Sequence, residues 1–192
     1  MASLMLHMAI GGKYCEINKI ESPIEFVSGN LAPDILSNKD DSHYLSGYYP
    51  SAYREAIMNR VNLFEFCKCN QLITDYNRGY FLHLVTDYVF YTQYLKNLET
   101  YKSLSDIPDD EMKILMYLEY DKIAYYLVNN YSEYVNPEML PPLAGRVDEN
   151  PMEIFSPDGI DKFINFCINI DLDDLYNRIK KKDYSLICNV KF

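Results

Sequence analysis

Hydrophobic residues recur at spacings of three and four along most of the chain, which is the pattern of helices that bury one face. The alternating pattern of strands bounded by hairpin turns is scarce. Five segments carry the helical spacing most clearly: 52–69, 71–98, 109–131, 158–169 and 171–182. A break near Asn70 separates the first two. The sequence therefore predicts an all-α fold, a multi-helix bundle.

The ends of a shorter helix are indicated by capping residues. The segment 22–25 offers a serine N-cap, a proline at the first helical position and a glutamate that would complete a capping box. Gly29 and Asn30 then resemble a left-handed C-cap, and Pro33 favours extended backbone before it. We therefore expect a helix from Ser22 to about Gly29, followed by an extended segment that presents Asp34.

Two stretches lack helical spacing. Polar and aromatic residues with turn formers over 39–50 predict an irregular loop that carries His43, and a helix is expected to resume at Ser51. Between Ser132 and Pro157, four prolines and a glycine predict a loop-rich crossing. Neither a repeat nor a low-complexity linker divides the chain, so one domain is predicted over 1–192.

Charge narrows the classes of partner. The formal net charge is −10, which disfavours tight nucleic-acid binding, because that binding depends on lysines and arginines that neutralise phosphates. The basic triplet at 180–182 suits a helix C-terminus instead. A small phosphate-containing substrate is compatible with this charge, since a bound metal cation sets the local field in its own site.

The five cysteines are scattered and odd in number, which is typical of reduced thiols rather than a disulfide framework. Cys67 and Cys69 lack the second ligand pair of a zinc finger, so buried thiols are the preferred interpretation. The first ten residues do not resemble a signal peptide, and no apolar stretch reaches the roughly 18 residues of a membrane span. These features predict a cytoplasmic protein without a transmembrane segment.

The chain has only three histidines: His7, His43 and His83. His83 and Asp87 are four residues apart on a predicted helix, so they lie on one face and can reach one ion. Alone, such a pair is more often a core histidine bonded to a carboxylate. A carboxylate on an apolar, tyrosine-rich face nevertheless needs a compensating cation or several hydrogen bonds, and a metal ion supplies that compensation.

Asp34 and His43 add to this pair because loops and helix ends can aim side chains at a helix-borne site. Two histidines with two aspartates form a mixed nitrogen and oxygen ligand set, which suits zinc, manganese or iron. His7 is a candidate ligand for a second ion that shares Asp87. The sequence thus predicts one or two divalent metal ions, and this ligand set does not by itself choose among zinc, manganese and iron.

Four segments together resemble the zinc-dependent phospholipase C family, whose relatives include fungal single-strand nucleases: His7–Ile10, Gly29–Asp34, Ser42–Tyr44 and Tyr80–Tyr88. The resemblance covers the first half of the chain. It implies an all-α fold, zinc as the preferred ion and hydrolysis of a phosphate ester. It further implies that the first metal is bound by Asp34, His43, His83 and Asp87. A further metal would be bound by His7, with Asp87 as the bridge between the two ions. Asp34 would also orient or deprotonate the attacking water.

The chain departs from the family in having no histidine after His83, whereas family members use several later ones. Asp121 is a candidate oxygen ligand in their place, while the neighbouring Glu119 is interpreted as part of a solvated acidic face. The leading hypothesis is a metal-dependent phosphoesterase acting on a small phosphate ester. A degenerate member with a structural or ligand-binding metal site and no catalysis is the alternative. The helical phosphohydrolases built on an adjacent His-Asp pair are disfavoured, since that dipeptide does not occur.

Overall fold

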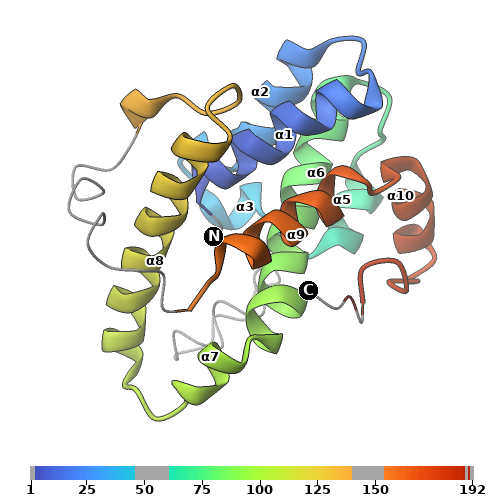
Figure 1. Cartoon of the computed structure of the whole chain (residues 1–192). Coiled ribbons are helices and arrows are strands. Elements are labelled where there is room, and N and C mark those ends of the chain that lie inside the picture. The colour runs from blue at the N-terminus through green and yellow to red at the C-terminus, as the bar shows by residue number, and fades with distance from the viewer. Residues whose placement is uncertain (1–2, 46–60, 140–153, 189, 191–192) are drawn as a thin grey trace.

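The structure is a computed structural model that describes residues 3–45, 61–139, 154–188 and 190. Within these ranges every regular element is a helix, so the all-α prediction is confirmed there (Figure 1). The elements are α1 (Leu4–Asn18), α2 (Pro23–Ile35), α3 (Lys39–Ser42), α5 (Leu63–Cys69), α6 (Asp75–Val89), a π-helix (Phe90–Leu95), α7 (Glu99–Ser103), α8 (Asp109–Asn130), a 3-10 turn (Pro137–Met139), α9 (Pro157–Ile168) and α10 (Leu172–Lys180).

Most predicted helices lie close to their predicted positions. The break near Asn70 is present, because α5 ends at Cys69 and α6 begins after its N-cap Thr74, whose hydroxyl accepts a hydrogen bond from the amide of Asn77. The last part of the segment predicted as helical over 71–98 is a π-helix. The predicted helix start at Ser51 and the centre of the proline-rich crossing lie outside the described residues.

The predicted end of the second helix is wrong, because α2 continues through both Gly29 and Pro33. Gly29 faces α6 at close range, where an added Cβ would overlap the carbonyl of Tyr76. Gly79 faces α2 in the same way, and its Cβ would overlap the carbonyl of Phe26. These glycines serve the close approach of two helices rather than a C-cap, and Asp34 consequently lies in the last turn of α2.

Contacts along α2 and α6 advance in the same direction, so the two helices run parallel. Near the start of both, the amide of Ser22 donates to Asp75 Oδ2 at 2.8 Å. Two turns further, the carbonyl of Asn30 lies 2.7 Å from His83 Nδ1. Ser22 is the N-cap residue as predicted, but its side chain makes no capping hydrogen bond, so the predicted capping box is not formed.

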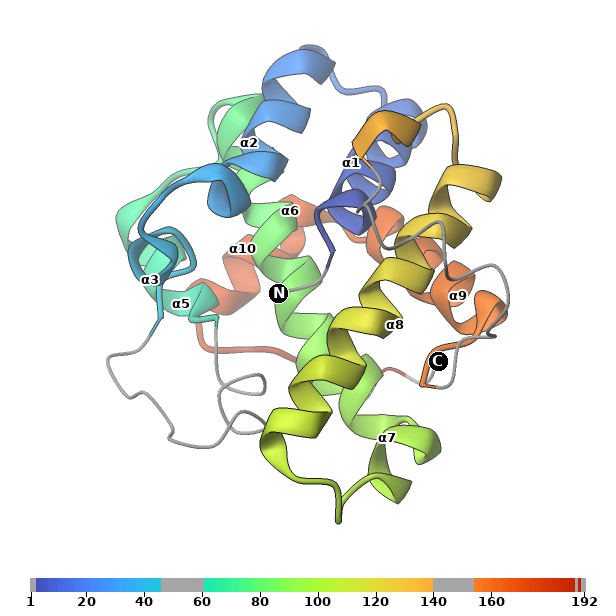
Figure 2. The same cartoon turned by 90° about the vertical axis from the view of Figure 1, so that its left-hand side faces the viewer.

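Helix α6 runs through the centre of the molecule, with α8 on one side and α5 and α10 on the other (Figures 1 and 2). One continuous cluster of buried hydrophobic residues extends from α1 to Ile187. Aromatic rings of the π-helix form its middle, where Tyr94 stacks on Phe155 and Phe163. Burial of this surface is the main contribution to the stability of such a fold. None of the described helices is long and apolar enough to cross a membrane.

The cysteines follow the sequence prediction only in part. All five have free thiols, as expected. Cys67 is buried as predicted, but the prediction of a buried thiol is wrong for Cys69, which is exposed. Burial raises the pKa of the Cys67 thiol to about 12. Neither cysteine belongs to a group of potential metal ligands among the described residues.

Candidate metal centre

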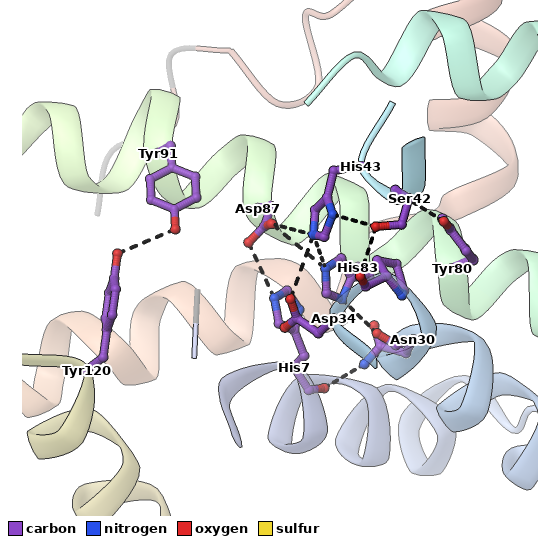
Figure 3. A network of polar contacts seen from close by, with 11 residues as sticks. His7, Asn30, Asp34, Ser42, His43, Tyr80, His83, Asp87, Tyr91 and Tyr120 are labelled. Carbon is purple, nitrogen blue, oxygen red and sulfur yellow. Dashed lines mark hydrogen bonds and ion pairs between the residues drawn. The ribbon is translucent and has the colours of Figure 1, made fainter. Parts of the chain in front are cut away.

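Four elements bring five polar side chains together beside α6 (Figure 3). Helix α6 supplies His83 and Asp87, α1 supplies His7, and α2 supplies Asp34 from its last turn. His43 directly follows the short helix α3. These are five of the six side chains that the sequence selects as metal ligands, and the fold brings these five together.

The atoms that face one another are imidazole Nε2 and carboxylate oxygens. The Nε2 atoms of His43 and His83 are 3.2 Å apart. Asp87 Oδ2 lies 3.6 Å from His43 Nε2 and 3.8 Å from His83 Nε2. Asp34 Oδ1 lies 3.8 Å from His43 Nε2, and Asp87 Oδ1 lies 3.3 Å from His7 Nε2. Two groups of potential ligand atoms result, one from His7, His83 and Asp87 and one from Asp34, His43 and His83.

The site is almost completely shielded from water. His7, His83 and Asp87 are fully buried, and His43 is 2% exposed. The side chain of Asp34 is the most exposed of the five, at 8%. The cluster is therefore most accessible to solvent on the Asp34 side.

Hydrogen bonds on the far side of each ring fix which nitrogen carries the proton. His83 Nδ1 faces the carbonyl of Asn30, which can only accept, so Nδ1 is the donor. His43 Nδ1 lies 3.0 Å from Ser42 Oγ, whose own proton is donated to the carbonyl of Pro33 at 2.9 Å. Ser42 Oγ must then accept from His43 Nδ1. In the neutral form of each ring, the hydrogen-bond network thus leaves the lone pair on Nε2.

Two lone pairs that face each other at 3.2 Å beside a carboxylate repel unless a cation lies between them. Burial lowers the pKa of His83 well below its usual range, and nearby His7 adds to this effect while Asp87 opposes it, so a proton is poorly held there. A metal ion fits better. Ligands about 2.0–2.2 Å from a tetrahedral zinc ion are about 3.3–3.6 Å apart, close to the observed separations. Metal-binding histidines also commonly donate their other ring N–H to a carbonyl.

Asp87 is the charged centre of the site. Burial by itself would raise the pKa of its carboxyl, but the adjacent His7 and His83 hold that pKa well below its usual range. Its two oxygens face different partners, with Oδ1 toward His7 and Oδ2 toward His43 and His83. An ionised, two-sided carboxylate of this kind can bind one ion or bridge two.

Asn30 and Ser42 support the ligands and were not identified as site residues from the sequence. The side-chain amide of Asn30 donates to the carbonyl of His7 at 2.6 Å, while its backbone carbonyl accepts from His83. A Cβ on Gly11 would overlap the Asn30 amide, so glycine makes room for it on α1. The rings of His7 and His83 stack with centroids 3.7 Å apart. The only sequence signal for Asn30 and Ser42 is that both lie within the segments that resemble the phospholipase C family.

The acidic residues of α8 are placed apart from this cluster. Asp121 belongs to neither group of potential ligand atoms, and partial burial raises the pKa of its carboxyl. The interpretation of Glu119 as a solvated residue is wrong, because its side chain is fully buried. Lys122 Nζ donates to Glu119 at 2.7 Å, and the amides of Ile154 and Phe155 donate to its other oxygen at 2.9 and 3.2 Å. Glu119 thus ties α8 to the segment before α9.

Beyond the end of α6, the hydroxyls of Tyr91 and Tyr120 lie 3.4 Å apart and join the π-helix to α8 (Figure 3).

Comparison of the chain with protein-family models, with curated proteins and with solved structures finds no match.

Proposed function

We propose that this chain is a metal-dependent phosphoester hydrolase whose divalent ion is bound by Asp34, His43, His83 and Asp87. The observation that carries the metal site is the facing pair of Nε2 lone pairs of His43 and His83, buried beside an ionised carboxylate. The resemblance to the zinc-dependent phospholipase C family supports the reaction class.

The ligand set favours particular ions. Two neutral imidazoles and two carboxylates would balance the charge of a divalent cation, so the buried site would carry no net charge. Borderline nitrogen ligands combined with hard oxygen ligands suit zinc first, with manganese or iron as alternatives.

Counting ligand atoms favours one tightly bound ion. His83 has a single nitrogen for metal, because its Nδ1 donates to Asn30, and His83 is a member of both groups of ligand atoms. With His83 committed to the ion beside His43, a second ion would be held by His7 Nε2 and Asp87 Oδ1 among the described residues. Fewer protein ligands mean weaker binding, so we expect the second ion to bind less tightly.

The chemistry follows from the placement of the aspartates. When bound, such an ion supplies an activated water nucleophile near neutral pH and offsets negative charge on the phosphoryl oxygens. Asp34 has the most exposed side chain of the cluster, so a substrate would approach there. Its carboxylate is then in position to orient a water and accept its proton. The net charge of −10 favours a small phosphate ester over a polyanionic nucleic acid.

The test is elemental analysis combined with turnover. Protein treated with a chelator and then dialysed against zinc, manganese, iron or nickel should retain about one ion per chain and hydrolyse an aryl phosphate monoester or diester. Asp87→Asn should lose the ion, and Asp34→Asn should lose most of the turnover. The exposed Asp158 on α9 provides a matched control, since Asp158→Asn removes a carboxylate far along the sequence from the cluster. If none of these ions binds and none restores turnover, the proposal fails.

The burial of the cluster favours a second candidate, a metal site that stabilises the fold without catalysis. Four of the five side chains are at most 2% exposed, which leaves little surface for a substrate. A structural ion would raise the melting temperature of the chain without supporting hydrolysis of either aryl phosphate. Retention of one ion in the absence of turnover would select this candidate.

A further inference from the structure

His43 is the one ligand of the cluster that does not lie within a described helix. It follows α3, a helix of four residues, which is too short to be stable by itself. A helix fixes the direction of a side chain through its backbone, whereas His43 depends on tertiary contacts for its position. The contacts of its neighbours in sequence therefore decide where Nε2 of His43 points.

Those contacts come from three directions. Ser42 is buried and donates through Oγ to the carbonyl of Pro33 on α2, while its own carbonyl accepts from the Tyr80 hydroxyl of α6 at 2.6 Å (Figure 3). Tyr44 has a positive φ of 52°, and its hydroxyl accepts from Asn70 Nδ2 at 2.7 Å. Left-handed backbone is costly for a tyrosine, so its presence here indicates that these surroundings determine the conformation.

The hydroxyl of Ser42 does more than hold the backbone. Helix α2 ends at Ile35, so the carbonyl of Pro33 belongs to the last turn of the helix. It takes the single proton of Ser42 Oγ, and that leaves only lone pairs on the oxygen for the His43 ring at 3.0 Å. A carbonyl in the last turn of α2 thus determines that His43 Nδ1 donates to Ser42 Oγ rather than accepting from it.

We propose that Ser42 is a positioning residue that selects the Nδ1–H form of His43 and so directs the Nε2 lone pair at the ion. The proposal rests on the proposed metal site. In the opposite tautomer Nε2 would carry a proton, which would point at His83 Nε2 and would have to leave before a metal could bind. Ser42 removes that barrier by accepting from Nδ1.

The test reads the tautomer and the metal affinity separately. Nitrogen-15 NMR of the histidine rings in metal-free protein should show His43 protonated at Nδ1 in the wild type. In Ser42→Ala this preference should be lost, and zinc affinity measured by competition with a chromophoric chelator should fall about 10–100-fold. Ser42→Thr keeps the hydroxyl and should retain the tautomer and most of the affinity. A purely structural role would not change the tautomer selectively.

Several results would overturn the proposal. A wild-type spectrum with His43 protonated at Nε2 does so without any variant, which covers the case in which Ser42→Ala fails to fold. Unchanged tautomer and zinc affinity in folded Ser42→Ala do so as well. If wild-type protein binds no metal at all, the proposed function fails, while the tautomer of metal-free protein still decides the role of Ser42.

Discussion

Substitution of Gly79 by alanine tests whether the helix crossing builds the metal site. Gly79 lies on α6 one turn before His83, at the point where α6 meets α2. An added Cβ would overlap the carbonyl oxygen of Phe26 and lie 2.8 Å from its carbonyl carbon and 2.9 Å from the amide of Asn30. All three atoms belong to backbone, so α2 and α6 can relieve the overlap only by moving apart.

Two opposing terms set the size of the effect. Alanine is favoured over glycine in a helix interior by about 1 kcal/mol. Overpacking of a tight interface costs about 1–3 kcal/mol, and more where backbone must move. Ordinary contact of a Cβ begins near 3.4 Å, so the carbonyl carbon at 2.8 Å already requires a displacement of about 0.6 Å, and the overlapping carbonyl oxygen requires more. We expect Gly79→Ala to lower the free energy of unfolding by about 2 kcal/mol.

The same displacement should reach the metal ligands. The hydrogen bond between His83 and the carbonyl of Asn30 crosses this interface, and Asp34 lies one turn beyond Asn30. Separation of the helices would lengthen that bond and move Asp34 away from His43. Zinc affinity should therefore fall at least about tenfold, which corresponds to 1.4 kcal/mol.

Urea unfolding of metal-free protein measures the first effect, and chelator competition measures the second. Gly12→Ala is the matched control, because it also places alanine in a helix, but the atoms nearest its Cβ belong to the side chain of Tyr134 rather than to the backbone of α2. Its effect on zinc affinity should be negligible. Gly79→Ala protein with wild-type stability and wild-type zinc affinity would refute the reasoning.

Three further predictions concern the metal and the thiols. Saturating zinc at about 1,000 times its Kd should raise the free energy of unfolding by about 4 kcal/mol, and a calorimetric transition unaffected by chelation would count against any native-state ion. His83→Ala should abolish stoichiometric zinc in elemental analysis, whereas His7→Ala should keep one ion; loss of that ion in His7→Ala would contradict the assignment of His7 to a second, weaker site. Cys69 should react fastest with Ellman's reagent at pH 8, while burial holds the pKa of Cys15 and Cys67 at about 11 and 12, so these two should react only on unfolding. Rapid labelling of Cys67 in native protein would exclude the buried position.

The prediction of the second helix shows where local rules fail. Glycine followed by asparagine and then proline resembles a helix end in any sequence, because glycine adopts left-handed backbone and proline lacks an amide. In this fold Gly29 is needed for contact with α6, and Pro33 lies close enough to the end of α2 for the loss of one hydrogen bond to be tolerated. The decisive partner, Tyr76, is 47 positions away in the sequence.

Glu119 illustrates the same difficulty for charge. A glutamate among acidic and polar residues is usually solvated, and its burial is stable here only because Lys122 and two amides near Ile154 bind both carboxylate oxygens. Lys122 can be identified from the sequence as a partner of Glu119, because it follows Glu119 by three positions on the same helix. The amides belong to a segment whose approach to α8 depends on the whole fold.

Sequence alone determined the helical class, the positions of most helices and the identities of the polar side chains that cluster beside α6. It could do so because helical periodicity is local, and because the spacing of His83 and Asp87 fixes their common face wherever the helix lies. Only the tertiary structure decided that the Nε2 lone pairs of His43 and His83 face each other. That depends on Asn30 and on the link from Pro33 through Ser42 to His43, whose hydrogen bonds join separate elements. A ring nitrogen acquires its proton from its surroundings in space, and no pattern along the chain records them.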